Sequence, residues 1–267
     1  MMNWSDKWRK LVLGSSLRKK SNPFTSGEFV EWYDLQLKHN KYPGILLDKV
    51  KVNLNKHSTV LEIGAGTGAF AIPLAKEVKE VTVVEPSEEM LAYLRRNRDI
   101  TNIRIINKRW EDVSMEEVGQ HDLVLAAHSL YDIIDIKTAL KKMLSAVRKH
   151  LYFIIRVSQL DFYANIWRCF KGEEYHPPPS FIHLYNVLYE LGVLANVEII
   201  RTSWELVYLS IEQAVKLWMA RLDLPPGRED ELRAYLLNHL KEKDGMLYLK
   251  EEKQSAIIYV DVGDIKC

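Results

Sequence analysis

The chain has 267 residues, of which 47% are hydrophobic, and its formal net charge at pH 7 is +1. A chain of this length and composition can bury one large core, so we expect a single decorated domain. The near-neutral charge gives no overall attraction to nucleic acid. Basic residues gather only near the start, where Asp6 is accompanied by six basic residues: Lys7, Arg9, Lys10, Arg18, Lys19 and Lys20.

The sequence gives no sign of a membrane segment or of a metal site. No window contains eighteen consecutive apolar residues, and the LVLGSSL stretch after Lys10 has too short an apolar core for a signal peptide. The two cysteines, Cys169 and Cys267, form neither a disulfide framework nor a zinc site. We therefore expect a cytoplasmic protein with no membrane association and no bound metal.

The first 55 residues are expected to form an N-terminal helical cap, with helical pieces at about 27–38 and 45–52. Trp4 and Trp8 lie four residues apart among basic residues, which is the spacing of one helix face. Such a segment can bind a partner or RNA, but more often it docks on its own domain.

From Ser58 onward, short β-branched runs alternate with helical periodicity, which is typical of βαβ units and a mostly parallel sheet. The expected strands are 59–63, 81–85, 103–107, 122–127 and 151–157. Helices are expected to begin near Phe70 and at Ser87, and a third one over 135–148.

After residue 157 the alternation stops, and two long strand-like runs follow at 196–209 and 254–262. They are separated from the earlier strands, and from each other, by insertions at about 158–195 and 210–253. The insertions contain helical patterns at 181–191, closed by Gly192, and at 211–222 and 229–241. Residues 56–267 therefore predict a Rossmann-like α/β domain with a seven-stranded, mostly parallel sheet, helices on both faces and helical cap insertions.

The stretch VLEIGAGTGAF at 60–70 fits two ligand-binding patterns. Gly64, Gly66 and Ala69 match the dinucleotide fingerprint, whereas an acidic Glu62 ahead of three alternating glycines matches a loop for S-adenosylmethionine. Both ligands need an acidic residue after the second strand, and Glu85 fills that place. Because Glu62 would repel a pyrophosphate and attract a sulfonium and an ammonium, its charge favours S-adenosylmethionine.

On these motifs the chain resembles the class I S-adenosylmethionine-dependent methyltransferases, from about residue 58 to 157. The matching stretches are LEIGAGTG, VVEPS, INKRWED and HDLVLAAHSLYDI. The family's usual glycine-aspartate pair appears here as Lys108 and Arg109. The resemblance implies a strand order of 3-2-1-4-5-7-6 with the last strand antiparallel, and S-adenosylhomocysteine as the product. It also implies a cofactor site at Glu62, Gly64, Ala65, Gly66, Gly68, Glu85, Pro86, Arg109, Trp110, Glu111, Ala127 and His128. Trp110 and Glu111 are expected to flank the adenine ring.

The candidate catalytic residues are His128 and Tyr131, with Ser129 between them, at the end of the fourth strand. A strand-end histidine can equally be a structural hydrogen-bonding residue, and a base is needed only when the acceptor keeps its proton. The sequence lacks an N/D-P-P-Y/F motif after the fourth strand and has no cysteine suitably placed for attack on cytosine. An acceptor with a planar nitrogen or a cytosine base is therefore less expected.

The cap regions carry many aromatic residues, some of which could line an acceptor pocket. We therefore expect methyl transfer to a small molecule. The alternatives are an RNA methyltransferase that uses the basic N-terminal segment, an NAD-binding oxidoreductase, and a cofactor-binding protein without catalysis. A homodimer is a further expectation that the sequence leaves open.

Overall fold

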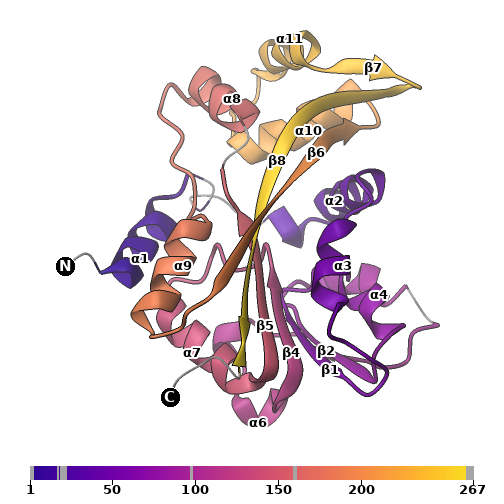
Figure 1. The fold of residues 1–267 in the computed structure, drawn as a ribbon. Helices are drawn as coiled ribbons and strands as arrows, with labels where there is room; N and C mark the ends of the chain where they lie inside the picture. The colour runs from indigo at the N-terminus through magenta and orange to yellow at the C-terminus, as the bar shows by residue number, and fades with distance from the viewer. Residues whose placement is uncertain (1–2, 17, 19–22, 97–98, 159–160, 263–267) are drawn as a thin grey trace.

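The structure, a computed structural model, describes residues 3–16, 18, 23–96, 99–158 and 161–262 (Figure 1). At its centre lies one sheet, in which the strand order is β3-β2-β1-β4-β5-β8-β6 and the short β7 pairs with β8. The strands are β1 (Thr59–Ile63), β2 (Glu80–Val84), β3 (Ile103–Ile106), β4 (His121–Ala127), β5 (Val147–Arg156), β6 (Asn196–Tyr208), β7 (Lys241–Lys243) and β8 (Met246–Asp261).

The first five strands pair in parallel, and β8 runs antiparallel to both β5 and β6. With β8 in the place of the seventh strand, this arrangement confirms the expected order. The expected count of seven is wrong, because β7 adds an eighth strand within the described part of the chain.

Helices cover both faces of the sheet and extend beyond its upper end in Figure 1. The α-helices are α1 (Trp4–Gly14), α2 (Gly27–His39), α3 (Ile45–Lys51), α4 (Ala71–Ala75), α5 (Glu88–Leu94), α6 (Met115–Val118), α7 (Ile136–Ala146), α8 (Asp161–Lys171), α9 (Phe181–Glu190), α10 (Ile211–Leu222) and α11 (Glu229–His239). Two 3₁₀ turns, η1 (Pro23–Thr25) and η2 (Trp110–Asp112), complete the described elements.

Alternating side chains along the strands supply two separate cores. Leu61 and Ile63 of β1 belong to the cluster shared with α1, α7 and α9, whereas Val60 belongs to the cluster shared with α3 and α4. Successive side chains of a strand point to opposite faces, so Glu62 lies on the same face as Val60. That face is the one covered by α3 and α4.

A third hydrophobic cluster lies beyond the end of the parallel strands. Here β6 and β8 continue together as a two-stranded ribbon, and α8, α10 and α11 lie against its far part (Figure 1). The cluster combines residues of these helices and of α2 with Leu206 and Tyr208 of β6. We call this unit, formed by α2, α8, α10, α11 and the far part of the β6–β8 ribbon, the cap.

The N-terminal helix α1 docks on the sheet domain. The Trp8 side chain is fully buried in the first core, and its Nε1 donates a hydrogen bond of 2.8 Å to the carbonyl of Ile133. The backbone N–H of Trp4 donates to a carboxylate oxygen of Glu190 on α9, at 2.7 Å. The described part of this segment therefore docks on its own domain through Trp4 and Trp8. Lys19 and Lys20 lie outside the described residues.

Several element boundaries differ from the sequence expectations, and three of them show why. The helix expected to reach residue 148 ends at Ala146, because Val147 already pairs with His121 as the first residue of β5. The helix expected to reach residue 241 ends at His239, because Lys241 pairs with Tyr248 in β7. The last strand begins at residue 246 instead of 254, because its first half pairs with the far half of β6.

Within the described residues, no helix combines the length and the apolar character that crossing a membrane requires.

Candidate cofactor and acceptor site

The glycine loop follows β1 directly and is shaped by close contacts and by left-handed backbone. A Cβ atom on Gly64, where φ is +73°, would lie 2.2 Å from the Cβ of Ser129, so only glycine fits beside β4. At Gly66, where φ is +57°, an added Cβ would meet nothing nearer than the Met90 sulfur at 4.0 Å. Gly66 therefore opens onto free space, where a ligand can approach the backbone. Ala65 beside it is buried in the second core.

Glu85 follows β2 and is held against this loop. One carboxylate oxygen accepts a hydrogen bond from the Gly66 N–H and the other accepts one from the Ser87 N–H, both at 2.9 Å. Burial raises the pKa of Glu85, and these two bonds act in the opposite direction. A carboxylate oxygen can accept more than one hydrogen bond, so Glu85 still has lone pairs for the hydroxyls of a ribose. Pro86, next to it, is exposed.

Glu62 is the most perturbed carboxyl group of the site. Its side chain is only 2% exposed, and its Oε2 atom has no hydrogen-bond partner among the described residues. Burial, with the nearby charge of Glu85 as the second cause, raises the pKa of Glu62 from 4.5 to about 8. A buried carboxylate oxygen without a partner calls for a ligand that carries a positive charge. This residue therefore fits the sulfonium and ammonium of S-adenosylmethionine.

Two tyrosines of the N-terminal segment lie over the glycine loop. Burial raises the pKa of Tyr33 to about 12, and the charges of Glu85 and Glu62 contribute to the shift. The pKa of Tyr42 is likewise raised by burial, and then by Tyr33 and Glu62. Further along the loop, Phe70 packs edge to face on the Tyr42 ring, with 5.7 Å between centroids. Tyr33 of α2 and Tyr42, which follows α2, therefore lie near Glu62.

The segment after β3 presents different side chains from those expected. Trp110 is buried, with an exposed fraction of 3%. Its Nε1 donates a hydrogen bond of 3.2 Å to the Ala139 carbonyl, and the Lys142 ammonium lies over its ring. Its indole therefore lies in the first core. Arg109 and Glu111 are exposed and form an ion pair of 2.8 Å, so they are the side chains of this segment that face solvent.

His128 follows Ala127 at the end of β4 in a left-handed conformation, with φ of +53°. Its backbone N–H donates to the Ile154 carbonyl at 2.7 Å, which fixes this unusual residue against β5. Its Nδ1 lies 3.0 Å from the Tyr131 hydroxyl. Its Nε2 lies 3.4 Å from the Ser255 hydroxyl.

The imidazole of His128 is uncharged at neutral pH. Burial lowers its pKa well below 6.5, and the positive charges of Lys253 and Arg156 lower it further. The Tyr131 hydroxyl oxygen also accepts a hydrogen bond from the Arg156 backbone N–H at 2.9 Å, which holds the hydroxyl beside Nδ1. The two predicted catalytic residues are therefore brought together as a hydrogen-bonded pair.

Arg156 and Lys253 reach this place from β5 and β8, and no sequence motif pointed to either residue. Arg156 stands at the end of β5 opposite Ser255 of β8, and its guanidinium lies 4.4 Å from the centroid of the Tyr131 ring. The Lys253 ammonium lies 3.9 Å from the centroid of a Trp204 ring on β6. Lys253 falls just ahead of the strand that was expected to begin at residue 254.

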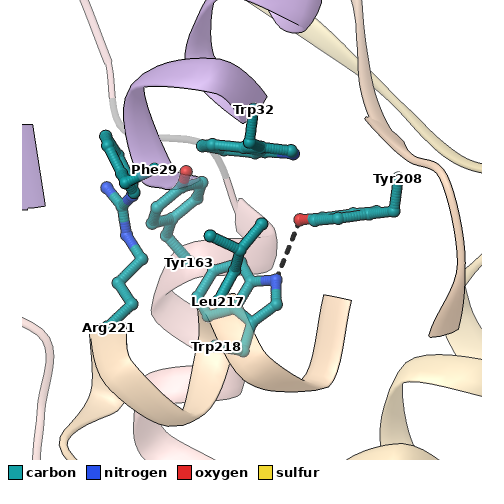
Figure 2. Close-up of a pocket in the computed structure, with 7 residues that line it drawn as sticks. All are labelled: Phe29, Trp32, Tyr163, Tyr208, Leu217, Trp218 and Arg221. Carbon is teal, nitrogen blue, oxygen red and sulfur yellow. Dashed lines mark hydrogen bonds between the residues drawn. The ribbon is translucent and has the colours of Figure 1, made fainter. Parts of the chain in front are cut away.

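The interior of the cap is too tightly packed to hold an acceptor. Figure 2 shows Phe29, Trp32, Tyr163 and Trp218 around a small cavity, with the Trp218 Nε1 donating to the Tyr208 hydroxyl at 2.9 Å. The volume of this cavity is about 10 Å³, which is room for about one water molecule.

Comparison with known families gives a match over the centre of the chain. Residues 60–150 match a family model described as a methyltransferase domain. This range contains the glycine loop, Glu85 and His128, and a methyltransferase domain agrees with the expected cofactor, S-adenosylmethionine.

Two curated relatives match parts of the chain. An uncharacterized protein of Haemophilus influenzae is 30% identical over 155 residues, which is 57% of this chain and 57% of the relative. A probable ribosomal RNA small subunit methyltransferase A of Methanosphaera stadtmanae is 34% identical over 89 residues, which is 30% of this chain and 33% of the relative. The chain thus matches about half of the first relative and a third of the second.

A solved structure is similar over almost the whole chain. The plantazolicin methyltransferase BpumL, crystallised with a pentazolic desmethylPZN analog and S-adenosylhomocysteine, aligns with a TM-score of 0.56 at 11% identity. The alignment covers 96% of this chain and 98% of that one. At this identity the likeness concerns the fold alone.

Proposed function

We propose that this chain, which belongs to the class I S-adenosylmethionine-dependent methyltransferases, transfers the methyl group of that donor to a small-molecule acceptor. The observation that carries the proposal is the pair of buried carboxylates at the glycine loop. Glu85 is fixed by two backbone N–H groups, and Glu62 has an oxygen without a partner among the described residues.

Residues at the glycine loop would bind different parts of the donor. Glu85 would accept hydrogen bonds from the ribose hydroxyls, and Glu62 would balance the positive charge of the methionine part. Gly66 leaves room for the ligand because it has no side chain in the free space. When bound, the donor supplies an electrophilic methyl group whose leaving group departs neutral.

The remaining groups act mainly by placing the acceptor and excluding water. Tyr33 and Tyr42 cover the loop, and the cap lies beyond His128, so the reacting atoms would be sheltered from solvent. An acceptor that must lose a proton could transfer it to the uncharged His128, whose orientation the Tyr131 hydroxyl fixes.

RNA is the second candidate acceptor, and one specific observation favours it. The relative from Methanosphaera stadtmanae is named as a probable ribosomal RNA methyltransferase and matches over 89 residues. On α1, the basic side chains of Arg9 and Lys10 are exposed, while Trp8 is buried in the domain.

Incubation with tritium-labelled donor would test both candidates. A cell extract is separated into small molecules, RNA and protein, and each fraction is incubated with the full-length chain. We expect label in the small-molecule fraction, insensitive to ribonuclease, and no label with the Glu85→Ala variant. Label in the RNA fraction would favour the second candidate, and no label in any fraction would contradict methyl transfer.

A further inference from the structure

We propose that the acceptor carries an anionic oxygen group, a carboxylate or a phosphate, and that Lys253 and Arg156 bind this group beside His128. This inference rests on the proposed function, because it concerns the acceptor of the same site. It is carried by the arrangement of charged and aromatic side chains where the β6–β8 ribbon leaves the sheet.

The strand register brings the two cations to the same face of the sheet. Arg156 of β5 pairs with Ser255 of β8, and Lys253 stands two residues before Ser255, so all three side chains point to one side. The Ser255 hydroxyl reaches the His128 Nε2 atom at 3.4 Å. The cations therefore flank the end of β4, where the candidate catalytic pair lies.

Lys253 has no carboxylate partner among the described residues. Its ammonium contacts aromatic rings instead, at 3.9 Å from a Trp204 ring centroid and 5.5 Å from the Tyr42 centroid. The nearest acidic residue along β8 on this side is Glu251. Its Oε1 accepts the backbone N–H of Phe162 at 2.9 Å, its Oε2 has no hydrogen-bond partner among the described residues, and it forms no ion pair with Lys253. An ammonium held in this way still has hydrogen-bond donors to offer to a ligand.

The surroundings of Lys253 disfavour its charged form when no anion is bound. Burial lowers the pKa of Lys253 to about 8, and the positive charge of Arg156 is the second cause. Two like charges in a sheltered place repel each other, and an anion between them would remove this repulsion. The guanidinium of Arg156 can bind carboxylate or phosphate oxygens with two parallel hydrogen bonds.

The two halves of the site thus favour ligands of opposite charge. The carboxyl groups of Glu62 and Glu85 lie at the glycine loop, whereas the positive charges of Lys253 and Arg156 lie near His128. Charges arranged in this way attract each ligand to its own half and oppose the reverse arrangement. The surrounding rings of Trp204 and Tyr42 favour a small acceptor with a flat, apolar body.

Titration calorimetry with three probes that share one body would test this inference. Benzoate, phenyl phosphate and benzamide are titrated into the full-length chain saturated with S-adenosylhomocysteine. We expect at least one of the two anions to bind ten times more tightly than the neutral benzamide, and the better anion identifies the group. Lys253→Met should remove the preference and Lys253→Arg should keep it. Lys250→Met, which changes an exposed lysine of the same strand, should have no effect.

Several results would overturn the inference. Equal binding of benzamide and both anions, no binding of either anion, or an unchanged preference in Lys253→Met would each do so. A loss of affinity for an RNA hairpin, but not for benzoate, in Lys253→Met would assign the cations to RNA. Both proteins are first titrated with S-adenosylhomocysteine. If the unchanged protein does not bind it, the proposed function is wrong. If Lys253→Met binds it, the variant is folded.

Discussion

Replacement of Glu62 by glutamine should stabilise the ligand-free protein in a pH-dependent manner. The folded-state pKa of Glu62 is raised from 4.5 to about 8. Between these two pH values the carboxyl group is protonated in the folded chain and ionised in the unfolded chain. Stability is therefore highest below pH 4.5 and falls as the pH rises toward 8. Each pH unit of this window corresponds to about 1.4 kcal/mol. At pH 7 the penalty amounts to about 3 kcal/mol, and glutamine, which has the same shape and no charge, does not incur it.

Urea unfolding of both proteins at pH 5 and pH 7, without ligand, measures this effect. The stability advantage of Glu62→Gln over the unchanged protein should grow by about 2–3 kcal/mol between the two pH values. Glu252→Gln, which replaces an exposed carboxylate on β8, is the matched control and should show no such growth. An advantage of Glu62→Gln that is equal at both pH values would refute the reasoning, because the carboxyl would then titrate alike in both states.

Three further predictions concern the cofactor site and the N-terminal helix. Glu85→Ala should weaken binding of S-adenosylhomocysteine by about 1.5–3 kcal/mol in calorimetry, and unchanged affinity would mean that the ribose lies elsewhere. Gly66→Ala should lower stability by only about 1–2 kcal/mol, because its φ is +57° and its surroundings are open, yet reduce that affinity more than tenfold. Equal affinity would show that the open space does not receive the ligand. Trp8→Ala should cost about 3–5 kcal/mol in urea unfolding, since the indole is fully buried. A loss below about 1 kcal/mol would show that α1 contributes little to the fold.

The parallel half of the sheet was predictable because its signals are local. The first strand was expected over 59–63 and spans Thr59–Ile63, since a short β-branched run ends there in a glycine turn. The helix after Ser87 also follows a local signal, because the serine hydroxyl accepts the Met90 N–H at 3.1 Å as an N-cap. The β6–β8 ribbon was underestimated because residues 246–253 are stabilised by pairing with residues about 45 positions earlier, which periodicity cannot show.

The candidate site shows the same difference between local and long-range signals. Glu62, Gly66 and Glu85 lie close together as expected, because the ends of neighbouring parallel strands meet at one edge of a sheet. Arg156 and Lys253 come from strands that are paired antiparallel and far apart in sequence, so no motif joined them. The position of the Trp110 indole in the core was also hidden, because its partner Ala139 belongs to a helix 29 residues later.

The central claim is that the glycine loop binds S-adenosylmethionine, and a thermal unfolding experiment with two ligands in parallel tests it most directly. S-Adenosylhomocysteine at a hundred times its dissociation constant should add about 2.7 kcal/mol of stability and raise the melting temperature, whereas NAD should not. The Glu85→Ala variant should show a smaller rise at the same ligand concentration. A rise with NAD alone would contradict the account.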